Sequence, residues 1–188
     1  MRLWAVVPIK GFAEAKSRLG PALPEAERRA FAEELATHVL SVLSEHPRVN
    51  RTLVATNSAE VAALARRLGA EVRPDAPGEA LSQVIDRALA HAAARGASHG
   101  LVVMGDLPRL SGAALDALIQ ALERGPVAVP DRHQVATNAL GLPLPTEAPT
   151  AFGTGESLAL HRARFQELTL LSLAEVEHDV DLPSDLAR

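Results

Sequence analysis

The sequence predicts an α/β fold, in which helices cover both faces of a mostly parallel sheet. Short β-like runs alternate with amphipathic helical stretches along the whole chain, a pattern typical of this class. Residues 100–104 (GLVVM) are apolar throughout, as expected of a central strand buried on both faces. The 188 residues, 47% of them hydrophobic, are enough for one compact domain with a substantial core. We therefore expect a single domain over residues 1–188.

The first part of the chain should pass twice from strand to helix. Pro8 ends the first apolar run, because proline cannot continue the hydrogen-bonded ladder of a sheet. Pro24 suits the first turn of a helix whose apolar side chains recur on one face. Asn57 or Ser58 can cap the next helix, and Gly69 stops it. The expected strands are residues 3–8, 52–56 and 71–73, and the expected helices are residues 24–45 and 58–68.

The remaining elements follow the same logic. Gly96 ends one helix and Ser111 can cap the next. Prolines at both ends delimit the strand around residue 128, and a proline-broken loop crosses residues 143–149. The expected helices are residues 80–95, 113–123 and 157–167, and the expected strands are residues 100–104, 126–130, 136–142 and 168–173.

Composition excludes several classes of function. With no cysteine, the chain has no disulfide framework, thiolate metal site or cysteine nucleophile, so a reducing cytoplasm fits. We expect a soluble, untargeted protein, because the chain shows no signal-peptide core and no apolar run of membrane-spanning length. A net charge of −4 without a long basic run argues against general nucleic-acid binding.

The only two lysines, Lys10 and Lys16, lie with Arg18 in the loop that follows the first strand. Every other cation is arginine. A lysine is a compact point charge and arginine a planar fork, so the two are poorly interchangeable at a tight phosphate site. This usage indicates a small anion, with phosphate the natural candidate. Two solvated surface lysines are the simpler alternative.

Asp106 follows the apolar strand and precedes a helix cap. Ligands of open α/β sheets gather beyond the carboxyl ends of the strands, so this carboxylate should share one rim with Lys10 and Lys16. There it could hold Mg2+, which takes carboxylates, waters and phosphate oxygens. Asp179 and Asp181 would project alike in an extended segment and could complete a metal site. A loop aspartate that bonds backbone amides, and an ordinary helix start at Pro183, are the alternatives.

Several motifs together resemble one family. They are Val7-Pro8-Ile9-Lys10, Ala15-Lys16-Ser17-Arg18-Leu19, Gly105-Asp106-Leu107-Pro108, Pro130-Asp131-Arg132, Thr137-Asn138-Ala139-Leu140, Phe152-Gly153 and Asp179-Val180-Asp181-Leu182-Pro183. Their order and spacing are similar to those of the 2-phospho-L-lactate guanylyltransferases, also described as phosphoenolpyruvate guanylyltransferases, which act in coenzyme F(420) biosynthesis.

The resemblance implies a three-layer nucleotidyltransferase-type fold, like that of the nucleotide-diphospho-sugar transferases. It implies a cytoplasmic enzyme that uses GTP and magnesium and moves GMP onto the phosphate of a three-carbon phosphoacid, with release of diphosphate. 2-Phospho-L-lactate, phosphoenolpyruvate and 3-phosphoglycerate all remain candidate acceptors. A homodimer is left open, and no nucleic acid or membrane partner is expected.

Roles for individual residues also come from the resemblance. The nucleotide contacts would be Pro8, Lys10, Lys16, Arg18, Ser82 and Asp106, of which Lys10, Lys16, Arg18 and Asp106 would be catalytic. The magnesium ligands would be Asp106, Asp179 and Asp181. The acceptor contacts would be Thr137, Gly153 and Ser157.

Two positions depart from the family pattern. The serine that follows the Phe-Gly turn is one residue out of step, so that either Ser157 or Glu156 could face the acceptor. Ser82 stands where the family has an asparagine near the base, which makes guanine preference less secure. The histidines show no metal or triad spacing, and we expect His133 and His161 to be solvated or locally hydrogen-bonded.

Two other functions compete with this interpretation. A molybdopterin guanylyl- or cytidylyltransferase would carry a Leu-x-Ala-Gly-x-Gly loop where this chain has Val7-Pro8-Ile9-Lys10. A nucleotide-binding regulator would keep the phosphate loop without turnover.

Overall fold

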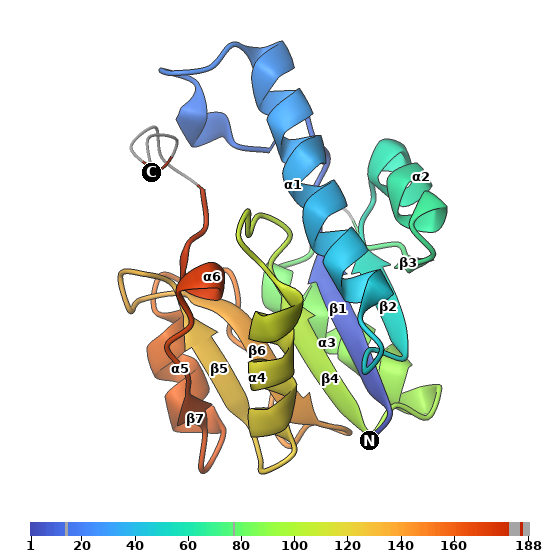
Figure 1. Cartoon of the computed structure of the whole chain (residues 1–188), viewed down its shortest axis with the longest axis vertical. Helices are drawn as coiled ribbons and strands as arrows, with labels where there is room; N and C mark the ends of the chain where they lie inside the picture. The colour runs from blue at the N-terminus through green and yellow to red at the C-terminus, as the bar shows by residue number, and fades with distance from the viewer. Residues whose placement is uncertain (14, 77, 181–184, 186–188) are drawn as a thin grey trace.

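The computed structural model describes residues 1–13, 15–76, 78–180 and 185. The predicted metal ligand Asp181 lies outside these residues. Figure 1 shows a sheet between two layers of helices, as predicted. The described residues form a seven-stranded sheet of order β3-β2-β1-β4-β6-β5-β7. Its strands are β1 (Leu3–Pro8), β2 (Arg51–Ala55), β3 (Glu71–Arg73), β4 (His99–Val103), β5 (Val127–Pro130), β6 (Thr137–Pro143) and β7 (Thr169–Leu170).

β6 is the one strand of this described sheet that runs antiparallel to its neighbours. Val103 pairs with Ala139, and the backbone N–H of Met104 donates to the carbonyl of Asn138 at 3.0 Å. The beginning of β6 therefore lies at the edge where β1 and β4 end, which is the upper edge in Figure 1.

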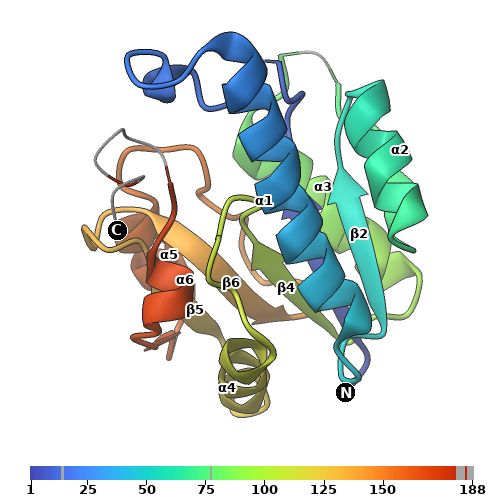
Figure 2. The same cartoon turned by 45° about the horizontal axis from the view of Figure 1, so that its top comes forward.

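Helices cover both faces of the sheet (Figures 1 and 2). One apolar cluster joins a face of the sheet to α1 (Glu25–Glu45), α2 (Ala59–Arg67), α4 (Gly112–Leu122) and α6 (Ala174–Glu177). The other cluster joins the opposite face to α3 (Leu81–Ala94) and to Phe152 and Phe165, which flank α5 (Ser157–Arg164). This arrangement explains the unbroken apolar runs of β1 and β4, since both faces of these strands are buried.

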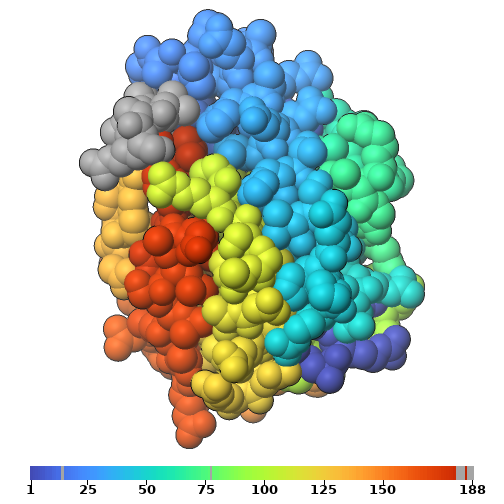
Figure 3. All heavy atoms as spheres, in the orientation of Figure 1, coloured from blue at the N-terminus to red at the C-terminus, as the bar shows by residue number. Residues whose placement is uncertain are grey.

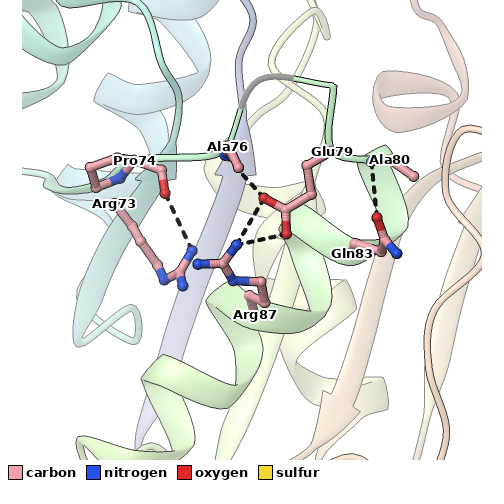
Figure 4. A network of polar contacts seen from close by, with 7 residues as sticks. All are labelled: Arg73, Pro74, Ala76, Glu79, Ala80, Gln83 and Arg87. Atoms are coloured by element: carbon pink, nitrogen blue, oxygen red, sulfur yellow. Dashed lines mark hydrogen bonds and ion pairs between the residues drawn. The ribbon is translucent and has the colours of Figure 1, made fainter.

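Local signals in the sequence place most helix ends correctly. The Ser58 hydroxyl accepts a hydrogen bond from the backbone N–H of Val61, and Ser111 does the same for Ala114. Each cap satisfies one of the first backbone N–H groups of a helix, which have no partner within the helix itself. At α3 the Gln83 side chain accepts from the backbone N–H of Ala80 at 3.2 Å (Figure 4).

The C-terminal elements differ from the prediction. The expected strand over residues 168–173 is only the two-residue edge strand β7, with both residues exposed. After it the carbonyl of Leu173 accepts from Val176 and Glu177 at 2.8 Å each, which starts the short helix α6 and buries Val176. α5 also ends three residues before the predicted end, because Phe165 leaves the helix and packs into the core. In the described part of the chain, the longest helices are too polar or too short to cross a bilayer.

Candidate active site

A cleft of about 480 Å³ lies where β1 and β4 end. From this pair the chain winds in opposite directions, toward β2 on one side and β6 on the other, and such switch points are where α/β sheets bind ligands. The walls are the loop after β1, part of α1, the β3–α3 segment and the turn after β4. The predicted site residues that line the cleft are Pro8, Lys10, Lys16, Arg18 and Asp106.

Lys16 and Asp106 meet inside this cleft. The Lys16 ammonium lies 2.5 Å from Oδ2 of Asp106, and the two side chains are only 7% and 25% exposed. Lys16 has a left-handed backbone with φ of 57° and leads into the 3-10 turn Ser17–Leu19. Non-glycine residues rarely adopt this conformation, and it recurs at binding sites. The loop is thus shaped to bring a cation against the carboxylate that follows β4.

Lys10 and Arg18 are exposed where they line the cleft. With Lys16 they place three cations around one carboxylate. Three cations on one side of the cleft suit a polyphosphate, whose charge exceeds what a single cation can offset.

The β3–α3 segment brings two acidic side chains to the opposite wall, Asp75 and Glu79. Glu79 accepts from the backbone N–H of Ala76 and from Arg87 (Figure 4). Both contacts favour the ionised carboxylate, so the pKa of Glu79 is lowered. Oδ1 of Asp75 is buried and has no hydrogen-bond partner among the described residues. Sequence reasoning missed both residues.

Ser82, predicted at this wall, is half-buried on α3 and is not among the described residues that line the cleft. Its neighbour Leu81 lines the cleft instead. The replacement of the family's asparagine by Ser82 therefore leaves the lining of the cleft unchanged at this position.

The predicted acceptor residues lie next to this cleft. Thr137 starts β6, directly before Asn138, which bonds to the cleft-lining Met104. Gly153 has φ of 81°, and a Cβ at this position would come within 3.0 Å of Cβ of Leu81. The turn that carries Gly153 therefore packs against the cleft wall, and only glycine fits there without strain.

Thr137 and Ser157 are both buried and bonded to each other. The Ser157 hydroxyl donates to Oγ1 of Thr137 at 3.4 Å. Glu156, the alternative to Ser157, is exposed. His161, which we expected to be solvated or locally hydrogen-bonded, is fully buried, and its Nδ1 lies 3.0 Å from Oγ1 of Thr137.

The structure describes only part of the predicted metal site. Asp106 is in the cleft, whereas Asp179 is half-buried near Arg132, whose pKa is raised by its bond to Asp185 and further by the charge of Asp179. Within the described ranges, no three histidine or acidic side chains gather as metal ligands.

One family model and several known enzymes match this chain over nearly its whole length. A model of the MobA-like NTP transferase domain matches residues 16–180. Phosphoenolpyruvate guanylyltransferase of Sphaerobacter thermophilus is 37% identical over 187 residues, which cover 97% of this chain and 89% of that protein. Its counterpart in Conexibacter woesei is also 37% identical, over 99% of this chain and 86% of that protein.

Solved structures share the fold at low identity. A Desulfovibrio desulfuricans protein assigned as a nucleotide-diphospho-sugar transferase superposes with a TM-score of 0.78 at 15% identity, over 99% of this chain and 85% of that one. A 4-diphosphocytidyl-2C-methyl-D-erythritol synthase from Anaerococcus prevotii superposes with a TM-score of 0.64 at 10% identity, over 99% and 93%. The predicted nucleotidyltransferase-type fold is confirmed.

Proposed function

Because the chain belongs to the MobA-like NTP transferase domains, and within them to the family of phosphoenolpyruvate guanylyltransferases, we propose that it moves GMP from GTP to the phosphate of a three-carbon phosphoacid. Diphosphate is the leaving group. The observation that carries the proposal is the Lys16–Asp106 pair in a cation-lined cleft at the switch point of the sheet. Phosphoenolpyruvate is the favoured acceptor, because the relatives are named for it.

Catalysis in this cleft rests on alignment and charge. An in-line attack on the α-phosphorus of GTP builds negative charge on the departing diphosphate, and preorganised cations lower that barrier. Lys10, Lys16 and Arg18 supply them. A phosphate monoester has a second pKa of about 6 and is mostly ionised at neutral pH, so the acceptor oxygen needs no general base.

A magnesium ion fits the residues of the cleft. Asp106 offers a partly exposed carboxylate beside the expected phosphates, and Mg2+ binds through one or two carboxylates together with phosphate oxygens and waters. Asp179 and Asp181 remain proposed further ligands. When bound, the ion would offset phosphate charge. Lys16 would then turn its ammonium from Asp106 toward a phosphate oxygen.

Guanine recognition is assigned to the acidic wall of the cleft. A carboxylate can accept from both N1–H and the amino group of guanine, whereas adenine offers no such pair of donors. The buried Oδ1 of Asp75, which has no partner among the described residues, supports this role.

The acceptor is proposed to bind at Thr137, Gly153 and Ser157. Their hydroxyl and backbone donors suit an anion that carries a phosphate and a carboxylate. Assembly of coenzyme F(420) is the proposed pathway, with 2-phospho-L-lactate as the alternative acceptor to phosphoenolpyruvate.

Release of diphosphate from GTP tests the proposal. The purified protein with magnesium should release diphosphate with phosphoenolpyruvate or 2-phospho-L-lactate and form the guanylylated acid, and 3-phosphoglycerate is the third acceptor to compare. GTP binding without release for any phosphoacid would instead indicate a regulator. Turnover with molybdopterin would indicate the other nucleotidyltransferase type, whose glycine-rich loop this chain lacks.

A further inference from the structure

His161 on α5 is buried among aromatic side chains. Its side chain is fully buried, with its ring 4.8 Å from that of Phe152 and 6.0 Å from that of Phe165, measured between centroids. These rings hold the imidazole in place and exclude water. Because a charged imidazole is poorly solvated there, its pKa is lowered to about 4, with Arg164 adding to the effect. His161 is therefore neutral at physiological pH.

The contacts of the ring decide which nitrogen carries the proton. Nε2 lies 2.8 Å from the backbone nitrogen of Ala151, which can only donate. Nε2 is then the acceptor, so the single proton of the neutral ring is on Nδ1. Nδ1 lies 3.0 Å from Oγ1 of Thr137 and donates to it.

This donation decides how Thr137 can bond. Oγ1 of Thr137 also accepts from the Ser157 hydroxyl at 3.4 Å. A hydroxyl oxygen has two lone pairs and one proton. With the His161 N–H on one lone pair, Thr137 keeps its own proton to donate, and among the described residues its Oγ1 has, besides His161, only the long contact to the Ser157 hydroxyl. An anion at the edge of the cleft would satisfy this buried donor.

The other nitrogen of the same ring holds the neighbouring turn. The carbonyl of Ala151 accepts from the Thr154 hydroxyl at 2.9 Å, while its N–H is bonded to His161. Gly153, one of the two residues between Ala151 and Thr154, packs on Leu81 at the cleft wall. One imidazole thus joins β6 to the turn and holds two of the three predicted acceptor contacts, Thr137 and Gly153.

We infer that His161 is a positioning residue for the acceptor: it fixes the Thr137 hydroxyl as a donor and the Gly153 turn beside it, so that both address one oxyanion of the phosphoacid. The inference rests on the proposed function and deepens it. His161 itself makes no contact with the substrate in this arrangement. It bonds to Thr137, and Ser157 bonds to the same hydroxyl.

Two substitutions of His161 distinguish the contributions of its two ring nitrogens. The amide nitrogen of His161→Asn falls near Nδ1 and can still donate to Thr137. The amide oxygen of His161→Gln falls near Nε2 and keeps only the bond to Ala151. We expect His161→Gln to raise the KM for phosphoenolpyruvate about 10- to 100-fold, as for a lost hydrogen bond to a charged group. His161→Asn keeps the donor to Thr137 but loses the neutral bond to Ala151, so its KM for phosphoenolpyruvate should rise less, by about 3- to 10-fold. The KM for GTP should be unchanged in both variants.

Thr137→Val and His99→Gln complete the experiment. Thr137→Val should match the loss in His161→Gln, and the double variant should lose no more than either, because both changes remove one donor. His99→Gln makes the same exchange at the opposite edge of the sheet and should leave both KM values unchanged. Equal losses for Asn and Gln, parallel rises in the KM for GTP, or additive losses would overturn the inference.

A measurement on the unaltered protein covers variants that fail to fold. 15N NMR of the imidazole should show His161 protonated on Nδ1 at pH 7, with its resonance moved when phosphoenolpyruvate is added and that of His99 unmoved. A proton on Nε2, or no movement, would overturn the inference. A wild-type protein without turnover would contradict the proposed function, whereas an active wild type with indistinguishable Asn and Gln variants would contradict the positioning role alone.

Discussion

The contact between Lys16 and Asp106 joins two residues that are 90 positions apart in the sequence. Each neutralises the other while no polyphosphate is bound. The pair therefore keeps a cation in the cleft without leaving it or the carboxylate uncompensated. We expect the two partners to contribute to different steps, the lysine to charge on the leaving group and the aspartate to the metal.

Lys16→Ala tests the first of these roles. Loss of one preorganised cation should lower kcat by roughly two to three orders of magnitude, with the fold intact by circular dichroism. Arg66→Ala, which removes an exposed cation on α2, serves as the matched control and should keep the wild-type rate. An unchanged kcat in Lys16→Ala would remove the phosphate role.

Asp106→Asn tests the proposed role of the aspartate as a ligand of the metal. The amide keeps the shape of the side chain but is a weaker ligand for magnesium, so turnover should fall below detection at any magnesium concentration. Because the Lys16 side chain is only 7% exposed, loss of its charged partner should also lower the free energy of unfolding by urea, by up to about 3 kcal/mol. A near-normal rate would show that Asp106 holds no metal.

Asp75→Ala tests the proposed reading of the base. Removing the carboxylate should raise the KM for GTP about 10-fold or more, as expected when a hydrogen bond with a charged partner is lost. Discrimination against ATP should shrink by the same factor, while the KM for the acceptor stays constant. A variant that keeps full discrimination would place guanine recognition elsewhere in the cleft.

At the scale of elements, the turn between β6 and α5 connects the acceptor residues to the cleft. Gly153 is the residue of this turn that contacts the cleft wall. A side chain there would strain the backbone, because φ is positive, and would crowd Leu81. The turn packs against Leu81 at the N-terminal end of α3, so a displaced turn would also disturb the cleft wall.

Gly153→Ala should therefore affect binding and stability together. The strained backbone costs about 1 kcal/mol or more, and the displaced turn should raise the KM for the acceptor more than that for GTP. Gly155→Ala offers the matched control, because its φ is not positive and no atom lies within 4 Å of the added Cβ. Urea unfolding and initial rates should be measured on both variants. Equal effects of Gly153→Ala and Gly155→Ala would show that the position of Gly153 has no special role.

Elements with strong local signals were predictable, and those that depend on tertiary context were not. β1 and β4 are confirmed because burial on both faces leaves an unbroken apolar run. β7 was overestimated because an exposed edge strand and a loop have the same alternating pattern. α5 was overestimated because Phe165 continues its apolar pattern but packs elsewhere.

The same contrast holds within the site. The clustering of Lys16 and Asp106 followed from one topological rule, that parallel strands end at one edge of the sheet. Glu79 lies in the stretch of residues 78–83 that resembles the family's base-binding segment, but neither it nor Asp75 matches a motif residue. His161 was expected to be solvated or locally bonded, and only its burial and its two partners show what it holds in place.

At the scale of the whole molecule, the order β3-β2-β1-β4-β6-β5-β7 gathers the site at one edge of the sheet. The residues proposed to bind the nucleotide follow the carboxyl ends of β1 and β4, and the reversed strand β6 places Thr137, a proposed acceptor contact, at its amino end. An all-parallel sheet would begin β6 at the far edge. The single reversal therefore explains how the proposed acceptor and nucleotide residues come to lie at the same edge.

Burial of a neutral histidine in this arrangement makes the stability of the whole fold depend on pH. The unfolded chain takes up a proton on His161 below about pH 6.5, whereas the folded protein does so only near pH 4. Between these values the unfolded state binds more protons, so the free energy of unfolding falls as the pH falls. The contribution is complete above pH 6.5 and amounts to at most about 3 kcal/mol.

Urea unfolding of the wild type and of His161→Asn at pH 7.0 and pH 4.5 measures this contribution. The wild type should lose about 2 kcal/mol more than the variant between the two values, because asparagine takes up no proton. Carboxylates and the remaining histidines, including His99, whose pKa is also lowered by burial, titrate in both proteins and cancel in the comparison. Equal losses would mean that His161 takes up its proton at the same pH in the folded and unfolded states, and the Thr137 hydroxyl would then lie beside a charged donor at pH 4.5.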